Sequence, residues 1–204
     1  MNRITALIRV VRPQQWVKNA FVFLSLFFSG DLLNTDKFLV TCAVFMAFSF
    51  AASAVYCLND IVDIAADRSH PKKRLRPLAS GALSKTSGWA LMTVLLLLSS
   101  ATLCFAGNSF PWDVQAVIGI YLLMNVAYTL GLKRIAIVDV FIISLGFVLR
   151  ILAGSFATQT PLSHWIVLMT FLLSLFLAFA KRRDDVLIYN ESGVRVRRNV
   201  VRLN

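Results

Sequence analysis

Six long apolar runs, separated by short polar connections, restrict the folds that this chain can adopt. A membrane-spanning helix needs about 20 predominantly apolar residues. Backbone N–H and C=O groups in lipid must be satisfied within their own segment, so each run is predicted to be helical. The predicted fold is an all-α, polytopic transmembrane helical bundle with about six spans. The segments are residues 16–28, 38–58, 89–105, 114–132, 135–156 and 165–180.

The composition agrees with a protein whose main solvent is lipid. Hydrophobic residues make up 58% of the 204 residues and charged residues only 15%, whereas soluble domains carry about 25% charged residues. The formal net charge of +11 would suggest a nucleic-acid partner in a soluble protein. Here the basic residues lie between the apolar runs, so we interpret them as topology signals and expect no nucleic-acid partner.

The charge of the connections alternates along the chain. The basic connections are the N-terminus and residues 67–85, 133–134 and 181–183. The other connections, residues 30–37, 106–113 and 157–164, contain three aspartates and one lysine. Because Lys and Arg accumulate on the cytoplasmic side of membrane proteins, we predict that the N-terminus and the basic connections are cytoplasmic.

Acidic residues cluster at the cytoplasmic end of the second predicted span. The chain has only ten carboxylates, and three of them are Asp60, Asp63 and Asp67. With Asn59 they have helical spacings, so a continuous helix would project all four side chains from one face. Their mutual repulsion requires a counter-charge, and Mg²⁺ prefers such oxygen ligands. The cluster is therefore a candidate site for a divalent cation.

A run of five cations, within residues 68–76, follows the acidic cluster directly. Pro71 disfavours helical structure at His70, so a loop is predicted to begin there. Carboxylates for a metal ion followed by cations for phosphate groups would suit a diphosphate substrate. The alternative interpretation is a solvated helix end whose neighbouring cations only set the topology.

Other polar residues lie in or beside the later spans. Asp139 and Arg150 share the fifth predicted span, where a helical rise of roughly 1.5 Å per residue places them about 16 Å apart. Each one therefore needs a partner from another helix or a water-filled cavity. The remaining candidates, near the cytoplasmic ends of the fourth and sixth spans, are Tyr128, Lys133, Lys181 and Arg182.

These motifs resemble a known family. Residues 59–67, NDIVDIAAD, are similar to the first aspartate-rich motif of the UbiA superfamily of intramembrane prenyltransferases. Residues 12–19 (RPQQWVKN), 67–81 (DRSHPKKRLRPLASG) and 146–154 (GFVLRILAG) narrow the resemblance to the decaprenyl-phosphate phosphoribosyltransferase branch. Because that superfamily usually has about nine spans, we expect residues 1–204 to form one UbiA-like domain that is incomplete at its C-terminus.

The resemblance implies a Mg²⁺-dependent transferase in the bacterial inner (plasma) membrane, with its active site facing the cytoplasm. The residues that the resemblance assigns to catalysis and to Mg²⁺ binding are Asn59, Asp60, Asp63 and Asp67. Such an enzyme moves 5-phosphoribose from 5-phosphoribosyl diphosphate to a polyprenyl (decaprenyl) phosphate and releases diphosphate, for cell-wall or glycolipid precursor synthesis. Membrane lipid is an implied partner, and the oligomeric state stays open. The residues that the resemblance assigns to substrate binding are Lys18, Arg68, His70, Lys73, Arg74, Tyr128, Lys133, Asp139, Arg150, Lys181 and Arg182.

Two alternatives remain open from the sequence. The first is a UbiA-type transferase that joins a prenyl diphosphate to an aromatic acceptor resembling 4-hydroxybenzoate. Such enzymes typically carry a second D-x-x-x-D motif near the end of the sixth helix, whereas residues 181–185 read KRRDD. The second alternative is a non-catalytic, truncated membrane protein.

Overall fold

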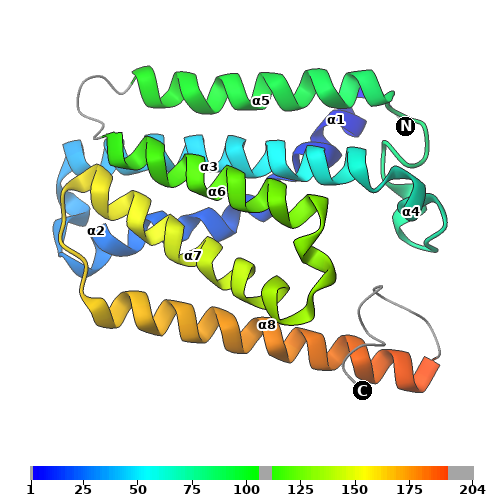
Figure 1. Ribbon diagram of the computed structural model, residues 1–204. Coiled ribbons are helices and arrows are strands. Elements are labelled where there is room, and N and C mark those ends of the chain that lie inside the picture. Colours follow the sequence, from blue (N-terminus) through cyan, green and yellow to red (C-terminus); the bar gives the residue numbers. More distant parts are fainter. Residues whose placement is uncertain (1, 106–111, 193–204) are drawn as a thin grey trace.

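The computed structural model describes residues 2–105 and 112–192, and all regular structure in these ranges is helical (Figure 1). This confirms the predicted all-α fold. The elements are α1 (Arg3–Val11), η1 (Pro13–Phe23), α2 (Leu24–Phe28), η2 (Asp31–Leu33), α3 (Thr35–Val62), α4 (Ile64–Arg68), η3 (Lys73–Leu75), α5 (Lys85–Phe105), α6 (Trp112–Leu130), η5 (Leu132–Arg134), α7 (Ala136–Thr158) and α8 (His164–Ser192).

Helix α3 lies at the centre of the molecule. It packs against α5, α6, α7 and η1, while α8 packs against α7 at the opposite edge from α5 (Figure 1). The main core is formed where these helices meet, and Phe48 of α3 contacts Tyr121 of α6 within it. The end of α3 that we predict to be cytoplasmic therefore lies outside the core, next to α4 and the loop that contains η3.

Among the described residues, five helices are long and apolar enough to cross a membrane, namely α3, α5, α6, α7 and α8. Five of the six predicted spans lie within these helices or extend beyond them by at most two residues. The first predicted span, residues 16–28, is instead formed by the 11-residue 3₁₀ helix η1 and the five-residue helix α2. A 3₁₀ helix rises about 2.0 Å per residue and an α-helix about 1.5 Å, so the two elements can extend over about 30 Å. That length is close to the thickness of the hydrocarbon layer.

The 3₁₀ geometry of η1 matches the spacing of two serines on α3. The indole N–H of Trp16 donates to Ser53, and the side-chain amide of Asn19 donates to Ser49, each at 3.0 Å. Three residues of a 3₁₀ helix rise about 6 Å, and so do four residues of an α-helix. Because residues three apart also lie on one face of a 3₁₀ helix, both donors meet their acceptors on the antiparallel α3.

Helix α7 approaches the end of η1 very closely at Gly154. A Cβ atom built on Gly154 would lie 1.9 Å from the carbonyl oxygen of Val22. Glycine is therefore required at this crossing, since any side chain would have to displace backbone atoms. The close approach also brings Arg150, one helical turn earlier on α7, to Asn19 of η1.

Candidate active site

The four residues of the predicted acidic motif lie where α3 ends. Asn59 and Asp60 belong to its last turn, Asp63 caps it, and Asp67 lies on the short helix α4. The N–H of Asp63 donates to the carbonyl of Asn59 at 2.9 Å, and the N–H of Asp67 donates to that of Asp63 at 2.8 Å. These bonds preserve the helical spacing across the break, so the motif stays together at one end of the molecule.

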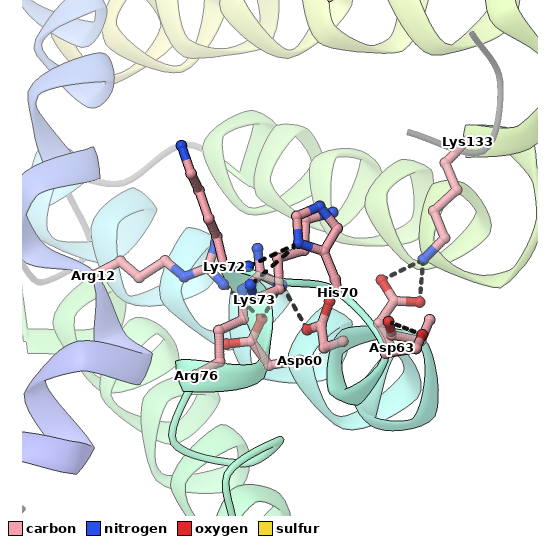
Figure 2. A network of polar contacts seen from close by, with 11 residues as sticks. Arg12, Asp60, Asp63, His70, Lys72, Lys73, Arg76 and Lys133 are labelled. Atoms are coloured by element: carbon pink, nitrogen blue, oxygen red, sulfur yellow. Dashed lines mark hydrogen bonds and ion pairs between the residues drawn. The ribbon is translucent and has the colours of Figure 1, made fainter. Parts of the chain in front are cut away.

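Asp60 and Asp67 form one half of the motif and share an arginine. Both side chains are buried, with exposed fractions of 2% and 4%. One guanidinium nitrogen of Arg76, Nη1, lies 3.1 Å from Oδ1 of Asp60 and 2.8 Å from Oδ2 of Asp67. Nη2 of Arg12 lies 2.5 Å from the same Asp60 oxygen (Figure 2). Two arginines from distant segments therefore neutralise this pair of carboxylates.

Asn59 and Asp63 form the other half of the motif and face α6 and η5. The hydroxyl of Thr129 donates to Oδ1 of Asn59 at 2.7 Å. The ammonium group of Lys133 lies 2.7 Å from both carboxylate oxygens of Asp63. Figure 2 shows Lys133 and Asp63 on one side and the arginines around Asp60 on the other. The sequence predicted that all four side chains would project from one face of a helix. In the structure they instead form two pairs, and each pair contacts a different set of residues.

The carboxylate oxygens of Asp60 and Asp67 are ligands of the kind that Mg²⁺ prefers. In the described part of the chain, no group of three or more His, Cys, Asp or Glu side chains could by itself hold a metal ion. Mg²⁺, however, usually takes one or two carboxylates and completes its shell with water and substrate phosphates. Nη1 of Arg76 already occupies a position between the two carboxylates. A Mg²⁺ ion bound by both carboxylates would have to take the place of this guanidinium group.

A second polar group joins α6, α7 and α8. The hydroxyl of Tyr128 donates to Oδ1 of Asp139 at 2.7 Å, and Arg182 forms an ion pair with Oδ2 of Asp139. Asp139 and Arg182 are both buried. The expectation that Asp139 needs a partner from another helix is confirmed, and three of the predicted site residues are in direct contact here.

Arg150 lies deeper in the bundle and is held by neutral groups. Nε donates to Oδ1 of Asn19 at 2.8 Å, Nη1 donates to the carbonyl of Gly146 at 2.5 Å, and Nη2 donates to the hydroxyl of Tyr121 at 3.3 Å. The rings of Phe48, Tyr121 and Phe147 surround its guanidinium carbon at 5.1–5.4 Å. Arg150 therefore has its partners on other helices, as expected, and connects η1 with α6 and α7.

Lys18 and Lys181 lie exposed on η1 and α8. Neither side chain forms an ion pair with the acidic motif in the described part of the chain.

The loop after α4 positions the remaining predicted residues. Nε of Arg68 donates to the carbonyl of Ala79 at 3.1 Å and so fixes the loop. Nδ1 of His70 accepts from the backbone N–H groups of Lys72 and Lys73 at 3.2 and 3.3 Å, which leaves the ring proton on Nε2. That atom is buried and has no hydrogen-bond partner among the described residues. The side chain of Arg74 is exposed.

Sequence reasoning did not single out Arg12, Arg76 or Thr129, although all three contact the acidic motif. Arg12 and Arg76 belong to the segments 12–19 and 67–81 that carry the family resemblance. The order of residues alone could not show that their side chains meet the same aspartate. The break in the helix after Val62 was likewise not predicted.

Comparisons with known proteins show the family to which the sequence is related. The family model described as the UbiA prenyltransferase family matches residues 19–196. The chain is 34% identical to the decaprenyl-phosphate phosphoribosyltransferase of Corynebacterium glutamicum, over 98% of this chain and 60% of the relative. It is 36% identical to the protein of the same name from Mycobacterium tuberculosis, over 98% of this chain and 66% of the relative. The chain thus spans 60–66% of the length of these curated relatives.

A solved structure shows the same fold. The structure of a UbiA homolog from Archaeoglobus fulgidus bound to DMAPP and Mg²⁺ superposes with a TM-score of 0.70 at 18% identity. The match covers 93% of this chain and 67% of that chain. At this level of identity, the comparison concerns the helical architecture alone.

Proposed function

The chain belongs to the UbiA prenyltransferase family, an integral membrane fold, and from that premise we propose that it transfers 5-phosphoribose from 5-phosphoribosyl diphosphate to a polyprenyl phosphate. The relatives that are 34–36% identical over 98% of this chain are decaprenyl-phosphate phosphoribosyltransferases. The chain spans less than two thirds of their length, so we propose the activity and the two substrates rather than assign them. We likewise propose that the protein lies in a bacterial inner membrane and that its active site faces the cytoplasm.

The observation that carries the proposal is the shared contact of Arg76 with Asp60 and Asp67 at the end of α3. Two buried carboxylates and two arginines meet where a membrane-spanning helix ends. Such a site can hold a cation and a diphosphate together, close to the depth that a lipid phosphate reaches. When a diphosphate leaves from a carbon atom, positioning of the two reactants and neutralisation of the developing negative charge can supply much of the rate.

Atoms and charges balance in the proposed reaction without a strong base. An oxygen of the polyprenyl phosphate attacks the anomeric carbon of the ribose, and the bond from that carbon to the diphosphate oxygen breaks. The diphosphate leaves with the bonding electron pair. Because the acceptor is already an anion, the protein does not have to remove a proton. Mg²⁺, when bound, would supply positive charge to the leaving diphosphate.

The chain's own residues divide between binding and orientation in this proposal. Asp60 and Asp67 would hold Mg²⁺, with Asn59 and Asp63 beside them. The buried Nε2–H of His70 would donate to a phosphate oxygen, because it has no other acceptor among the described residues. The further residues proposed to bind substrate are Lys18, Arg68, Lys73, Arg74, Tyr128, Lys133, Asp139, Arg150, Lys181 and Arg182.

A transfer assay tests the proposal. The purified chain is incubated with radiolabelled 5-phosphoribosyl diphosphate, a polyprenyl phosphate and Mg²⁺, and we expect label in the lipid extract that EDTA abolishes. A parallel reaction contains a prenyl diphosphate and 4-hydroxybenzoate. Product only in the parallel reaction would replace the proposal with aromatic prenyl transfer, and no product in either reaction would contradict both.

A further inference from the structure

A cavity of about 440 Å³ lies between the α1–η1 turn and the loop that contains η3. Its charged lining residues are Arg9, Arg12, Lys72, Arg76 and Asp60. Four cations face one carboxylate, so the walls carry a formal charge of +3. The volume lies within the range of small-molecule sites, which is about 300–1,000 Å³. Its charge favours an anionic ligand.

Two of these cations form no ion pair with the acidic motif. Arg12 and Arg76 form ion pairs with Asp60, whereas Arg9 and Lys72 form no ion pair with any residue that the structure describes. Figure 2 shows Lys72 beside Arg12 and Arg76, on the side of Asp60 away from Lys133. Because no carboxylate neutralises Arg9 or Lys72 in the described part of the chain, the cavity keeps positive charge that can attract an anion.

Arg12 is held in an unusual conformation at the mouth of this cavity. Its backbone φ is +55°, in the left-handed region that non-glycine residues seldom adopt. Its guanidinium lies over the ring of Tyr56, with the central carbon 4.9 Å from the ring centroid. Strained backbone conformations are concentrated at functional sites. The stacking orients the guanidinium before any ligand arrives.

We propose that this cavity binds a phosphate monoester. A dianionic phosphate suits a wall of charge +3, and arginine guanidinium groups bind phosphate oxygens through paired hydrogen bonds. The side-chain amides of Gln14 and Gln15 also line the cavity and can bond to hydroxyl groups. Building on the proposed function, the ligand is the 5-phosphate end of the sugar donor, whose diphosphate end would then lie at Asp60. A lipid phosphate headgroup has the same chemistry and is the other source to be distinguished.

Calorimetric titration of the whole chain in detergent with ribose 5-phosphate tests the cavity. We expect Arg9→Gln to weaken binding about tenfold, because a charge-assisted contact is lost. Arg3→Gln is the matched control, since Arg3 is exposed on the same helix and does not line the cavity. Lys72→Gln should act like Arg9→Gln, with Lys85→Gln as its control. Equal affinities in all four variants would overturn the proposal.

A second titration distinguishes the source of the phosphate. Phosphatidic acid dissolved in the same detergent micelles competes with ribose 5-phosphate if the cavity takes a lipid headgroup, and it does not if the cavity takes a soluble sugar phosphate. Binding of neither probe would overturn the cavity proposal. Because ribose 5-phosphate has no leaving group, its binding is independent of transfer. If ribose 5-phosphate binds but no transfer occurs, only the proposed function is contradicted. If transfer occurs and its kinetics are unchanged in Arg9→Gln and Lys72→Gln, only the proposal that the cavity binds a phosphate is contradicted.

Discussion

The ammonium nitrogen of Lys133 lies 2.7 Å from each carboxylate oxygen of Asp63, across 70 residues of sequence. The contact joins the connection between α6 and α7 to the end of α3. It also neutralises the motif carboxylate that Arg12 and Arg76 do not contact. The two side chains are 23% and 32% exposed, so water screens the pair and limits its contribution to stability.

Replacing Lys133 should therefore affect the reaction far more than the fold. We expect Lys133→Met to lower turnover about 100-fold, because removal of one positioned hydrogen-bond donor from an active site typically has an effect of this size. The free energy of unfolding should change by no more than about 1 kcal/mol, as is usual for exposed ion pairs. Transfer assays and thermal unfolding in detergent measure the two effects, with Lys85→Met as control. Wild-type turnover in Lys133→Met would exclude a catalytic role.

Replacing Asp60 should affect both function and stability. Its side chain is 2% exposed, and Arg12 and Arg76 both pair with it. We expect Asp60→Asn to abolish turnover and to lower the free energy of unfolding by about 1–3 kcal/mol, less than for a fully buried pair because the arginines remain partly in water.

Asp63→Asn is the matched comparison for Asp60→Asn, because it should also abolish turnover while costing at most about 1 kcal/mol of stability. Denaturant titrations in detergent provide the stability measurement. If the two variants lost the same amount of stability, the prediction that the buried Asp60 contributes more to stability than the partly exposed Asp63 would be wrong.

Gly154 should tolerate no side chain. In Gly154→Ala the new Cβ would lie 1.9 Å from a backbone oxygen of Val22, which cannot move without shifting η1. We expect a loss of at least about 1–3 kcal/mol, as for other overpacked sites. Gly119→Ala is the control, since a Cβ there meets nothing within 4 Å, and helix propensity should make it neutral or stabilising. Unfolding temperatures that fall equally in both variants would contradict the close crossing.

The five helices that can cross a membrane could be predicted from the sequence because their signal is local. A run of about 20 apolar residues needs no partner to be recognised, since a helix satisfies its own backbone in lipid. The predicted span 38–58 accordingly lies within α3, and the predicted span 135–156 begins one residue before α7 and ends inside it. The existence of the acidic motif was equally local, because its spacing is written in nine consecutive residues. Its metal-binding role stays a prediction.

By itself the sequence thus determined which segments are membrane helices and where the acidic residues gather. Only the tertiary structure decided which cations face each carboxylate, because Arg12 and Lys133 come from 48 and 70 residues away and meet their partners through helix packing. The 3₁₀ form of η1 has the same origin. Its three-residue repeat matches the four-residue repeat of Ser49 and Ser53 on α3 only when the two helices lie side by side. Distances between segments depend on how side chains fill the space between helices, and no spacing along the chain encodes them.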